Sequence, residues 1–372
     1  MKVGLLTLPI IYNYGAILQA YALHKTINEL GAECTLLDVA LPIYPYYRRP
    51  LSIVSRLYSR IKKNSDCEII PYWMSKRTER IISQKTRPFV EKYINRKTVP
   101  IKRLDKSVDN YDVYIVGSDQ VWRRSVGLSI ENYLFDFVAD NKKKCSYAAS
   151  FGVDYWEYNP DKTQRMKNLM GKFSLITVRE DSAVGLIKEK LQLDAQQVLD
   201  PTMLLEASDY NALIRNSKYN RSEDFIFTYI LDLDEHKSKI VEALSSIQEM
   251  EVVDILPRTQ LSYFKSANNH VYPEVEEWLY NLSHANAVLT DSFHGTVFSI
   301  IYNKPFVVLK NDKRGNTRLN SLLAMFGLEE RVATTIDEAK VLIHREIDWE
   351  EVNKILLSKK EMSINKLKEM ID

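Results

Sequence analysis

Short apolar runs alternate with segments of helical periodicity along the first half of the chain. Residues 2–8 form an apolar run, residues 16–31 carry apolar side chains at helical spacing, and residues 33–39 form a second apolar run. This order predicts a strand, a helix and a strand, which is the unit that builds parallel sheets. We also predict a turn at residues 13–15, strands at residues 111–119, 143–152 and 170–181, and a helix at residues 182–192.

The second half of the chain repeats this alternation. Predicted strands occupy residues 224–231, 251–256, 286–292 and 305–310, and predicted helices occupy residues 239–248, 274–285, 295–303 and 349–372. We therefore predict an α/β fold of two doubly wound Rossmann-like domains with a central cleft. The prediction places the domains at residues 1–175 and 176–345, a basic helical insertion at about residues 45–100, and a C-terminal helix at residues 346–372.

The composition is that of a folded globular protein. Hydrophobic residues make up 45% and charged residues 27% of the 372 residues, and the net charge is +2. A net charge this small does not favour polyanion binding, so we predict no nucleic-acid partner. Cys34, Cys67 and Cys145 lie far apart, which favours a reducing compartment over a disulfide scaffold. The sequence has none of the recognised spacings of metal ligands, and we predict neither a metal nor a bound cofactor.

Positive charge is concentrated between Pro45 and Arg103, which hold 16 Lys and Arg but 4 Asp and Glu, a surplus of +12 that leaves −10 for the rest of the chain. Within this stretch, Arg48–Lys63 sets apolar side chains at helical spacing among six basic residues. That pattern is typical of a helix at an anionic membrane surface. The alternative is a helix that packs on its own domain. No apolar run approaches the ~20 residues that span a bilayer, so we predict a cytoplasmic protein, either free or peripheral to the inner face of the membrane.

Polar clusters follow several predicted strands, where the carboxyl ends of parallel strands form ligand sites. The first cluster is Asn13, Tyr14 and Gly15. It either forms a turn that tightens at the glycine or presents its tyrosine for stacking on a sugar. Asp119 follows a strand in the middle of the N-terminal half, where it would at least cap a turn.

Arg179 and His294 carry the most specific candidate chemistry. Arg179 ends a predicted strand, and it either pairs with Glu180 or Asp181 or clamps a phosphate or carboxylate with its planar guanidinium. His294 follows Ser292 at the predicted N-terminus of a helix, where unpaired backbone N–H groups and the helix dipole favour an anion. The alternative is a histidine buried in the core.

Six blocks of the sequence resemble the polysaccharide pyruvyl transferase family in order and spacing. They are NYGAILQAYAL (13–23), VGSDQVW (116–122), SYAASFG (146–152), VREDS (178–182), LDPT (199–202) and LTDSFHGTVFSIIYNKPFV (289–307). The resemblance implies a fold like that of the GT-B glycosyltransferases, with phosphoenolpyruvate as co-substrate. It also implies a bacterial transferase that forms a pyruvate ketal on a sugar or lipid-linked oligosaccharide acceptor, in exopolysaccharide or capsule biosynthesis.

The resemblance also implies roles for individual residues. His294 matches the cleft histidine of the family, which would protonate or orient the donor, and Arg179 matches an arginine that holds the donor. Many members carry an arginine two residues before that histidine, where this chain has Ser292. Arg318 or Lys310 would then supply the missing charge, unless the donor differs.

The other candidates for substrate binding are Asn13, Tyr14, Gly15 and Gly295, and Asp119 is a candidate base at the acceptor hydroxyl. Two further functions stay open. One is a nucleotide-sugar-dependent glycosyltransferase on the same two-domain scaffold, for which the sequence shows no distinctive base or ribose motif. The other is a non-catalytic glycan-assembly subunit, which would bind glycan but release no phosphate.

Overall fold

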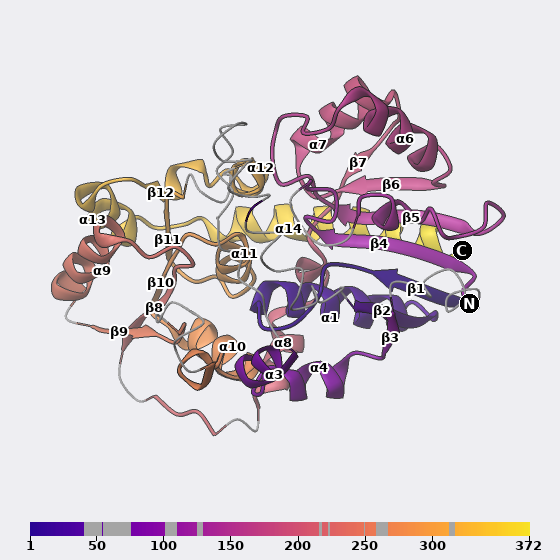
Figure 1. Cartoon of the computed structure of the whole chain (residues 1–372). Coiled ribbons are helices and arrows are strands. Elements are labelled where there is room, and N and C mark those ends of the chain that lie inside the picture. Colours follow the sequence, from indigo (N-terminus) through magenta and orange to yellow (C-terminus); the bar gives the residue numbers. More distant parts are fainter. Residues whose placement is uncertain are drawn as a thin grey trace.

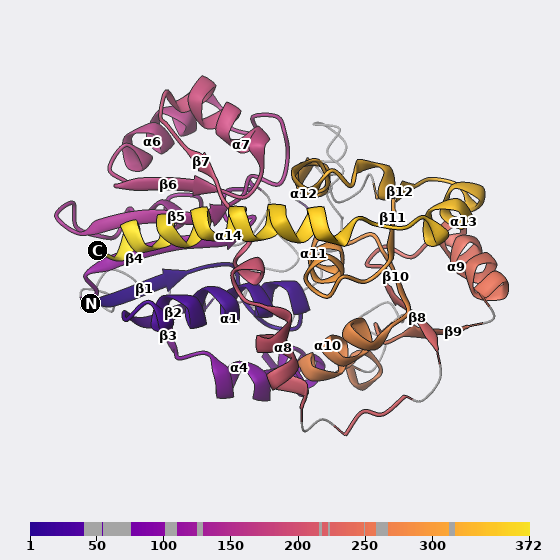
Figure 2. The same ribbon diagram turned by 180° about the vertical axis from the view of Figure 1, so that it is seen from behind.

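The chain folds into two α/β domains, seen side by side in Figure 1 and from behind in Figure 2. The structure is a computed structural model that describes residues 1–40, 54, 76–100, 110–124, 129–215, 218–221, 224–248, 250–257, 267–311 and 317–372. The predicted membrane-surface segment Arg48–Lys63 lies outside the described residues except for Val54.

The N-terminal domain is built on a parallel sheet, in which seven strands of the described chain follow the order β3-β2-β1-β4-β5-β6-β7. They are β1 (Lys2–Leu6), β2 (Glu33–Ala40), β3 (Arg96–Pro100), β4 (Val113–Asp119), β5 (Lys143–Ala149), β6 (Leu175–Val178) and β7 (Gln196–Gln197). Val3 of β1 pairs with Cys34 of β2 on one side and Val113 of β4 on the other. The strand order reverses between β1 and β4, which is where ligand crevices form in such sheets.

The C-terminal domain has a second parallel sheet, with five strands in the described chain in the order β12-β11-β10-β8-β9. They are β8 (Phe225–Tyr229), β9 (Glu251–Asp254), β10 (Ala287–Thr290), β11 (Phe306–Leu309) and β12 (Val332–Ala333). Every residue of β8, β10 and β11 is buried, as expected for parallel strands covered by helices on both faces. The strand order of this sheet reverses between β8 and β10.

Helices connect and cover the two sheets. The α-helices are α1 (Tyr14–Glu29), α3 (Lys76–Ile82), α4 (Arg87–Tyr93), α6 (Pro160–Met170), α7 (Asp181–Leu186), α8 (Ala207–Ile214), α9 (Glu235–Gln248), α10 (Val275–His284), α11 (Phe293–Ile301), α12 (Thr317–Phe326), α13 (Ile336–His344) and α14 (Trp349–Ile371). The short helices are η3 (Asn132–Leu134), η4 (Ile187–Leu191, a π-helix), η5 (Pro201–Leu204), η6 (Ala267–His270) and η7 (Glu329–Arg331). In the described part of the chain, no helix combines the length and the apolar character needed to cross a bilayer.

The last helix returns to the first domain. Both views show α14 leaving the C-terminal domain and running along the N-terminal sheet, so that the two chain termini lie near each other. Two contacts anchor it there: Leu199 N donates to Ser363 Oγ at 3.0 Å, and Lys143 Nζ donates to Glu369 O at 2.9 Å. α14 occupies the segment where the apolar periodicity predicts a C-terminal helix.

The structure contains elements that were not predicted, among them α6, α8, α12 and α13, and it also differs from predicted elements as follows. α1 begins at Tyr14, so residues 14 and 15 belong to the helix and not to a turn. Residues 96–100 form the edge strand β3, because its β-branched residues pair with β2, and the predicted insertion is helical only in part. β6 and β7 pair within the N-terminal sheet, which therefore extends past the predicted boundary at residue 175 to Gln197.

Tyr14 packs at the junction of the two domains and is not available for stacking on a sugar. Its ring is fully buried and lies 5.7 Å from the ring of Trp278 in α10, at an interplanar angle of 20°. Its hydroxyl donates to Pro273 O at 3.1 Å. Ile17 of α1 and Phe298 of α11 belong to the same apolar cluster, so the domains share one core. The prediction of a substrate-binding tyrosine is therefore wrong for this residue.

We expect Tyr14→Ala to lower the free energy of unfolding by about 3–5 kcal/mol, the range for removing a buried aromatic ring. Denaturant unfolding measures this loss. Tyr155→Ala is the matched control, because Tyr155 is 60% exposed and its removal leaves no cavity. If the two variants prove equally stable, Tyr14 does not hold the domains together.

Candidate functional site

A cleft opens where the carboxyl ends of the two sheets face each other. Its volume is about 660 Å³ including the open mouth, and residues of both domains line it. The sequence-predicted residues Asn13, Asp119, Ser292, His294 and Arg318 are all part of this lining. Most of the candidate site is therefore one place in the structure, as the positions after the strands predict.

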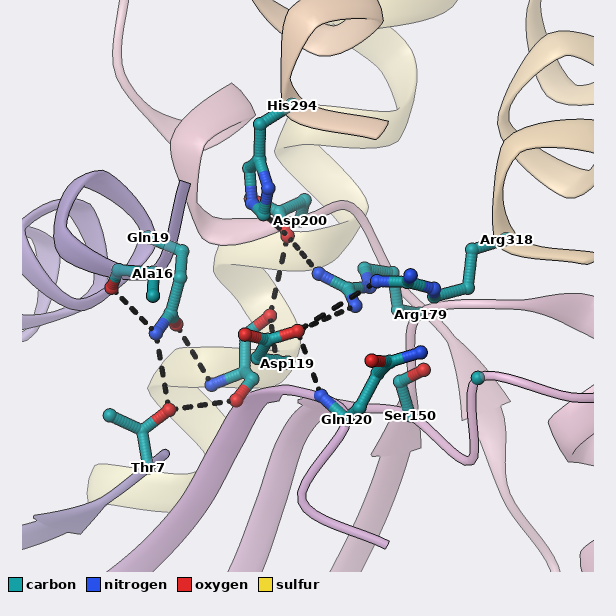
Figure 3. A network of polar contacts seen from close by, with 12 residues as sticks. Thr7, Ala16, Gln19, Asp119, Gln120, Ser150, Arg179, Asp200, His294 and Arg318 are labelled. Carbon is teal, nitrogen blue, oxygen red and sulfur yellow. Dashed lines mark hydrogen bonds and ion pairs between the residues drawn. The ribbon is translucent and has the colours of Figure 1, made fainter. Parts of the chain in front are cut away.

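The carboxylate of Asp200 lies behind the cleft and joins its walls (Figure 3). Its Oδ2 accepts hydrogen bonds from Arg179 Nη1 at 2.9 Å and Ser118 Oγ at 3.3 Å, and its Oδ1 accepts from N and Oγ1 of Thr202 at 3.1 and 2.7 Å. His294 Nε2 lies 3.7 Å from Oδ2, an electrostatic contact longer than a hydrogen bond. Burial alone would raise the pKa of Asp200, but the neighbouring His294 and Arg179 hold it well below its usual range.

Arg179 forms ion pairs with two aspartates. Besides Asp200, it binds Asp119, with 3.3 Å between Nη2 and Oδ1, and its guanidinium lies 4.5 Å from the ring centroid of Phe293. Burial alone would lower the pKa of Arg179, and the two carboxylates outweigh it and raise the pKa. The alternative pairing with Glu180 or Asp181 is wrong, because Asp119 and Asp200 are its ion-pair partners in the described chain.

Asp119 lies between two arginines at the end of β4. Its Oδ1 is 3.3 Å from Arg179 Nη2 and 3.8 Å from Arg318 Nη1. Burial would raise the pKa of this carboxyl, but the positive charges of the two arginines and the nearby His294 outweigh that effect and lower it. A carboxylate with a lowered pKa is a weak proton acceptor at neutral pH, so the geometry argues against Asp119 as a base.

A buried amide fastens α1 to the end of β4. Gln19 Oε1 accepts from Ser118 N at 3.2 Å, and Gln19 Nε2 donates to Thr7 Oγ1 at 3.1 Å and to Ala16 O at 3.0 Å. Thr7 Oγ1 closes the ring by donating to Ser118 O at 2.8 Å. Gln19 was not predicted from the sequence, although a single amide within the apolar run of residues 16–23 was a usable signal.

His294 lies where the N-termini of α1 and α11 meet. Ser292 is the N-cap residue of α11, as predicted, although its side chain makes no capping hydrogen bond. A Cβ atom on Gly15 would stand 2.1 Å from His294 Nδ1, so the glycine serves close approach of the imidazole and not a turn. Gly295 is required for a similar reason, since a Cβ atom there would stand 2.1 Å from Thr290 Oγ1. Two helix N-termini at one point favour an anionic ligand.

A second buried carboxylate, Asp291, secures the C-terminal wall of the cleft. It accepts hydrogen bonds from the backbone N of Leu231 at 2.6 Å and of Asp232 at 3.1 Å. Lys237 Nζ and Asn311 Nδ2 complete its shell at 2.7 and 2.8 Å. Neither Asp291 nor Asp200 was predicted from the sequence, because an aspartate next to a strand end is also common in turns.

Lys310 is not part of the cleft. It lines a neighbouring cavity of the C-terminal domain together with Asp234, His236 and Thr334, and this cavity shares Asn311 with the cleft. Of the two candidates for the missing charge, Arg318 lines the cleft, whereas Lys310 lines the adjoining cavity and its proposed role stays a prediction. Among the described residues, no group of three or more His, Cys, Asp and Glu is arranged to hold a metal ion.

We expect Asp200→Asn to destabilise the fold by about 3–5 kcal/mol at pH 7, because it leaves the Arg179 charge buried without its closest partner. The pKa of Asp200 is lower in the folded chain than its unfolded value of about 3.9. The stabilisation is therefore present above about pH 4 and is lost as the pH falls.

Denaturant unfolding at several pH values between 7 and 3 measures this effect. The difference between wild type and Asp200→Asn should shrink toward pH 3. Asp194→Asn is the control, because Asp194 is 91% exposed and pairs with Lys188 at the surface, and it should resemble wild type throughout. A difference that does not change with pH would show that the loss is not due to charge.

Two solved structures with the same architecture show the fold of the chain. S. aureus MnaA in its UDP co-structure is 14% identical, with a TM-score of 0.51, over 97% of this chain and 91% of that chain. Arabidopsis thaliana UGT89C1 complexed with UDP-L-rhamnose is 10% identical, with a TM-score of 0.51, over 99% and 98% of the two chains. With the two parallel sheets, these similarities confirm the predicted α/β fold of two Rossmann-like domains resembling GT-B glycosyltransferases.

Sequence comparison identifies the family. Among curated proteins no match was found. The sequence model of the family described as polysaccharide pyruvyl transferase matches residues 13–313, which is most of the chain and includes all six blocks that carry the resemblance. The chain therefore belongs to the polysaccharide pyruvyl transferase family.

Proposed function

We propose that this protein transfers the enolpyruvyl group of phosphoenolpyruvate to two hydroxyls of a sugar and closes a pyruvate ketal, in the assembly of a bacterial surface polysaccharide. Membership of the family supports a transferase that modifies polysaccharide. The observation that carries the finer proposal is the placement of His294 at two helix N-termini, in a cleft that also holds Arg318. A proton donor beside an anion site is what an enol phosphate donor requires.

The reaction balances without a further reactant. A proton is added to the methylene carbon of phosphoenolpyruvate, and the neighbouring carbon becomes electrophilic. One sugar hydroxyl forms a bond to that carbon, the bond to the phosphate oxygen breaks, and the second hydroxyl forms the other bond of the ketal. Of the two hydroxyl protons, one replaces the proton that the general acid has given to the methylene group, and the other leaves with inorganic phosphate.

His294 is our candidate for the general acid. Its Nε2 is buried and lies 3.7 Å from Asp200 Oδ2. Its Nδ1 packs against Gly15 at the start of α1, so the ring is held between α1 and Asp200. Asp119 is assigned to holding Arg179 and Arg318 in place, because its lowered pKa makes it a poor base.

Arg318 is our candidate for the positive charge that Ser292 does not supply. It lines the cleft, whereas Arg179 is 4% exposed and bound to Asp119 and Asp200. We therefore assign donor contact to Arg318 and the support of the cleft floor to Arg179. The acceptor is proposed to be a sugar or a lipid-linked oligosaccharide, and peripheral contact with an anionic membrane remains a proposal that rests on the basic segment.

The proposal is tested by the release of inorganic phosphate from phosphoenolpyruvate with a panel of simple and lipid-linked glycosides. Calorimetric titration with phosphoenolpyruvate and with UDP-sugars provides the comparison. Arabidopsis thaliana UGT89C1 and S. aureus MnaA, which share this fold, were solved with UDP-L-rhamnose and UDP, so a nucleotide-sugar-dependent glycosyltransferase is the second candidate. Binding of a UDP-sugar without any turnover of phosphoenolpyruvate would favour that candidate.

We expect His294→Ala to lower the rate of phosphate release by roughly 10²–10⁴-fold, the usual contribution of a general acid. The dissociation constant of phosphoenolpyruvate should change much less, because the arginine and the helix N-termini stay in place. His344→Ala, at the exposed end of α13, is the control and should keep the wild-type rate. A His294→Ala enzyme with a normal rate would mean that the acid lies elsewhere.

Arg318→Lys and Arg179→Lys should change different properties of the protein. In both, lysine keeps the charge but loses the planar guanidinium. We expect Arg318→Lys to weaken phosphoenolpyruvate binding about tenfold with little change in melting temperature. Arg179→Lys should lower the melting temperature clearly, because it disturbs two buried ion pairs. Calorimetry and thermal unfolding separate the two, and a reversed result would return the role of donor contact to Arg179.

A further inference from the structure

A tight turn after β4 brings two side chains together at the edge of the cleft. Gln120 N donates to Asp119 Oδ1 at 2.9 Å, and Arg123 N donates to Gln120 O at 3.2 Å, which closes a turn of four residues. The side chains of the first and last residues of this turn, Gln120 and Arg123, therefore start close to each other. Neither residue has a role in the reaction as described above.

The amide of Gln120 bridges two arginines. In the amide orientation that satisfies both of its ends, its oxygen accepts from Arg123 Nη1 at 3.2 Å and from Arg318 Nη2 at 3.1 Å. Figure 3 shows Gln120 and Arg318 approaching each other from the two domains. One neutral oxygen thus receives donors from two cations, an arrangement that guanidinium groups more often make with a phosphate or carboxylate.

The position of the amide is built by the loop after β5. In this orientation the side-chain oxygen of Gln120 lies against Gly152, since a Cβ atom on Gly152 would stand 2.1 Å from it, and the glycine has a φ of +72°. The buried carboxylate of Glu180 holds this loop, since its Oε1 accepts from Ser150 Oγ at 2.9 Å, Phe151 N at 2.9 Å and Gly152 N at 3.1 Å. The space beside the two arginines is therefore shaped by the fold.

The positive charge around this amide is poorly compensated. Burial, with the neighbouring charge of Arg179, lowers the pKa of Arg318 to about 10. Among the described residues, its ion-pair partner is Asp119 at 3.8 Å, which Arg179 binds more closely at 3.3 Å. Within the described chain, Arg123 Nε is buried and has no hydrogen-bond partner. A guanidinium with an unused buried donor is a ready ligand for an anion.

This cluster adjoins the proposed reaction centre. Gln120 and Arg318 line the same cleft as His294. The guanidinium of Arg318 also lies 5.8 Å from the ring centroid of Phe293, the first residue of α11. An anion held by the two arginines would therefore sit next to the helix N-terminus that carries the histidine.

We infer that Arg123 and Arg318 form the subsite for the phosphate group of the donor, and that the side-chain oxygen of Gln120 occupies the position of one phosphate oxygen. This inference rests on the proposed function for the identity of the donor, and it adds Arg123 and Gln120 as positioning residues for the reaction. Through its contact with Gln120, Arg123 provides a second guanidinium beside a cleft in which Ser292 stands at the position of the family arginine. Binding of a phosphate group then requires the Gln120 side chain to turn aside.

Calorimetric titration of the full chain with phosphoenolpyruvate and, separately, with inorganic phosphate tests the subsite. Arg123→Gln should raise both dissociation constants about tenfold or more, because it removes a charged donor. Arg124→Gln is the matched control: Arg124 is exposed and donates to Glu157 O at 3.2 Å, and its replacement should leave both constants within about twofold of wild type. Equal affinities for Arg123→Gln and wild type would overturn the inference.

Two substitutions of Gln120 test the shared position. Gln120→Glu places a carboxylate between the arginines, so it should weaken binding of both anions about tenfold or more without lowering the melting temperature. Gln120→Ala removes the internal oxygen and should not weaken binding. If the two variants bind phosphate equally well, or if Gln120→Ala binds it more weakly than wild type, the amide does not mark a phosphate position.

The same titrations separate this inference from the proposed function. If inorganic phosphate binds and Arg123→Gln weakens it, but no acceptor releases phosphate from phosphoenolpyruvate, the subsite stands and the proposed donor is wrong. If phosphoenolpyruvate turns over normally in Arg123→Gln with unchanged affinity, the subsite alone is wrong. Wild-type protein that binds neither anion at millimolar concentration would also overturn the subsite.

Discussion

A carboxylate without access to water must be paired, and the pairing of Asp200 organises the centre of this molecule. Its two oxygens accept from Arg179, from Ser118 and from Thr202, and one of them faces His294. These partners belong to β4, to the end of β6, to η5 and to α11. One buried charge therefore joins the ends of β4 and β6 to η5 and faces α11 of the C-terminal domain, and the lowered pKa of Asp200 indicates that its ionised form is the stable one.

Close packing between the two domains also positions His294. Gly15 lets the imidazole of His294 lie against the first turn of α1, and Tyr14 beside it packs on Trp278 of the other domain. The histidine is thus held by both domains at once, and a change in the angle between them would move it relative to Asp200. The block NYGAILQAYAL contributes no reacting group. Its residues instead support His294 and the end of β4, which explains why it lies beside the site.

The α/β fold could be predicted from the sequence. The candidate residues Asn13, Asp119, Ser292, His294 and Arg318 lie in one cleft, as expected because positions after parallel strands converge at one edge of a sheet. The sequence did not predict β3 or the start of α1 at Tyr14, since pairing with β2 and packing against Trp278 are tertiary effects with no local signal.

The ion-pair partners of individual charged residues could not be predicted from the sequence either. Arg179 looked like a donor clamp, and its pairing with Asp119 and Asp200 depends on chain segments that are 60 and 21 residues away. Lys310 was equally plausible as Arg318 until the fold placed it in another cavity. Asp200 and Gln19 were not predicted for a different reason. In a sequence, a buried polar residue that supports other side chains cannot be distinguished from one that caps a helix.

The central claim is that a protonated His294 delivers its proton to the methylene carbon of phosphoenolpyruvate. The reaction run in deuterium oxide, with the product examined by nuclear magnetic resonance, tests this most directly. The account predicts that one deuterium enters the methyl group of the pyruvate ketal for each phosphate released, and that His294→Ala forms almost none of this product. Ketal formation without deuterium in the methyl group, or undiminished labelling in His294→Ala, would contradict it.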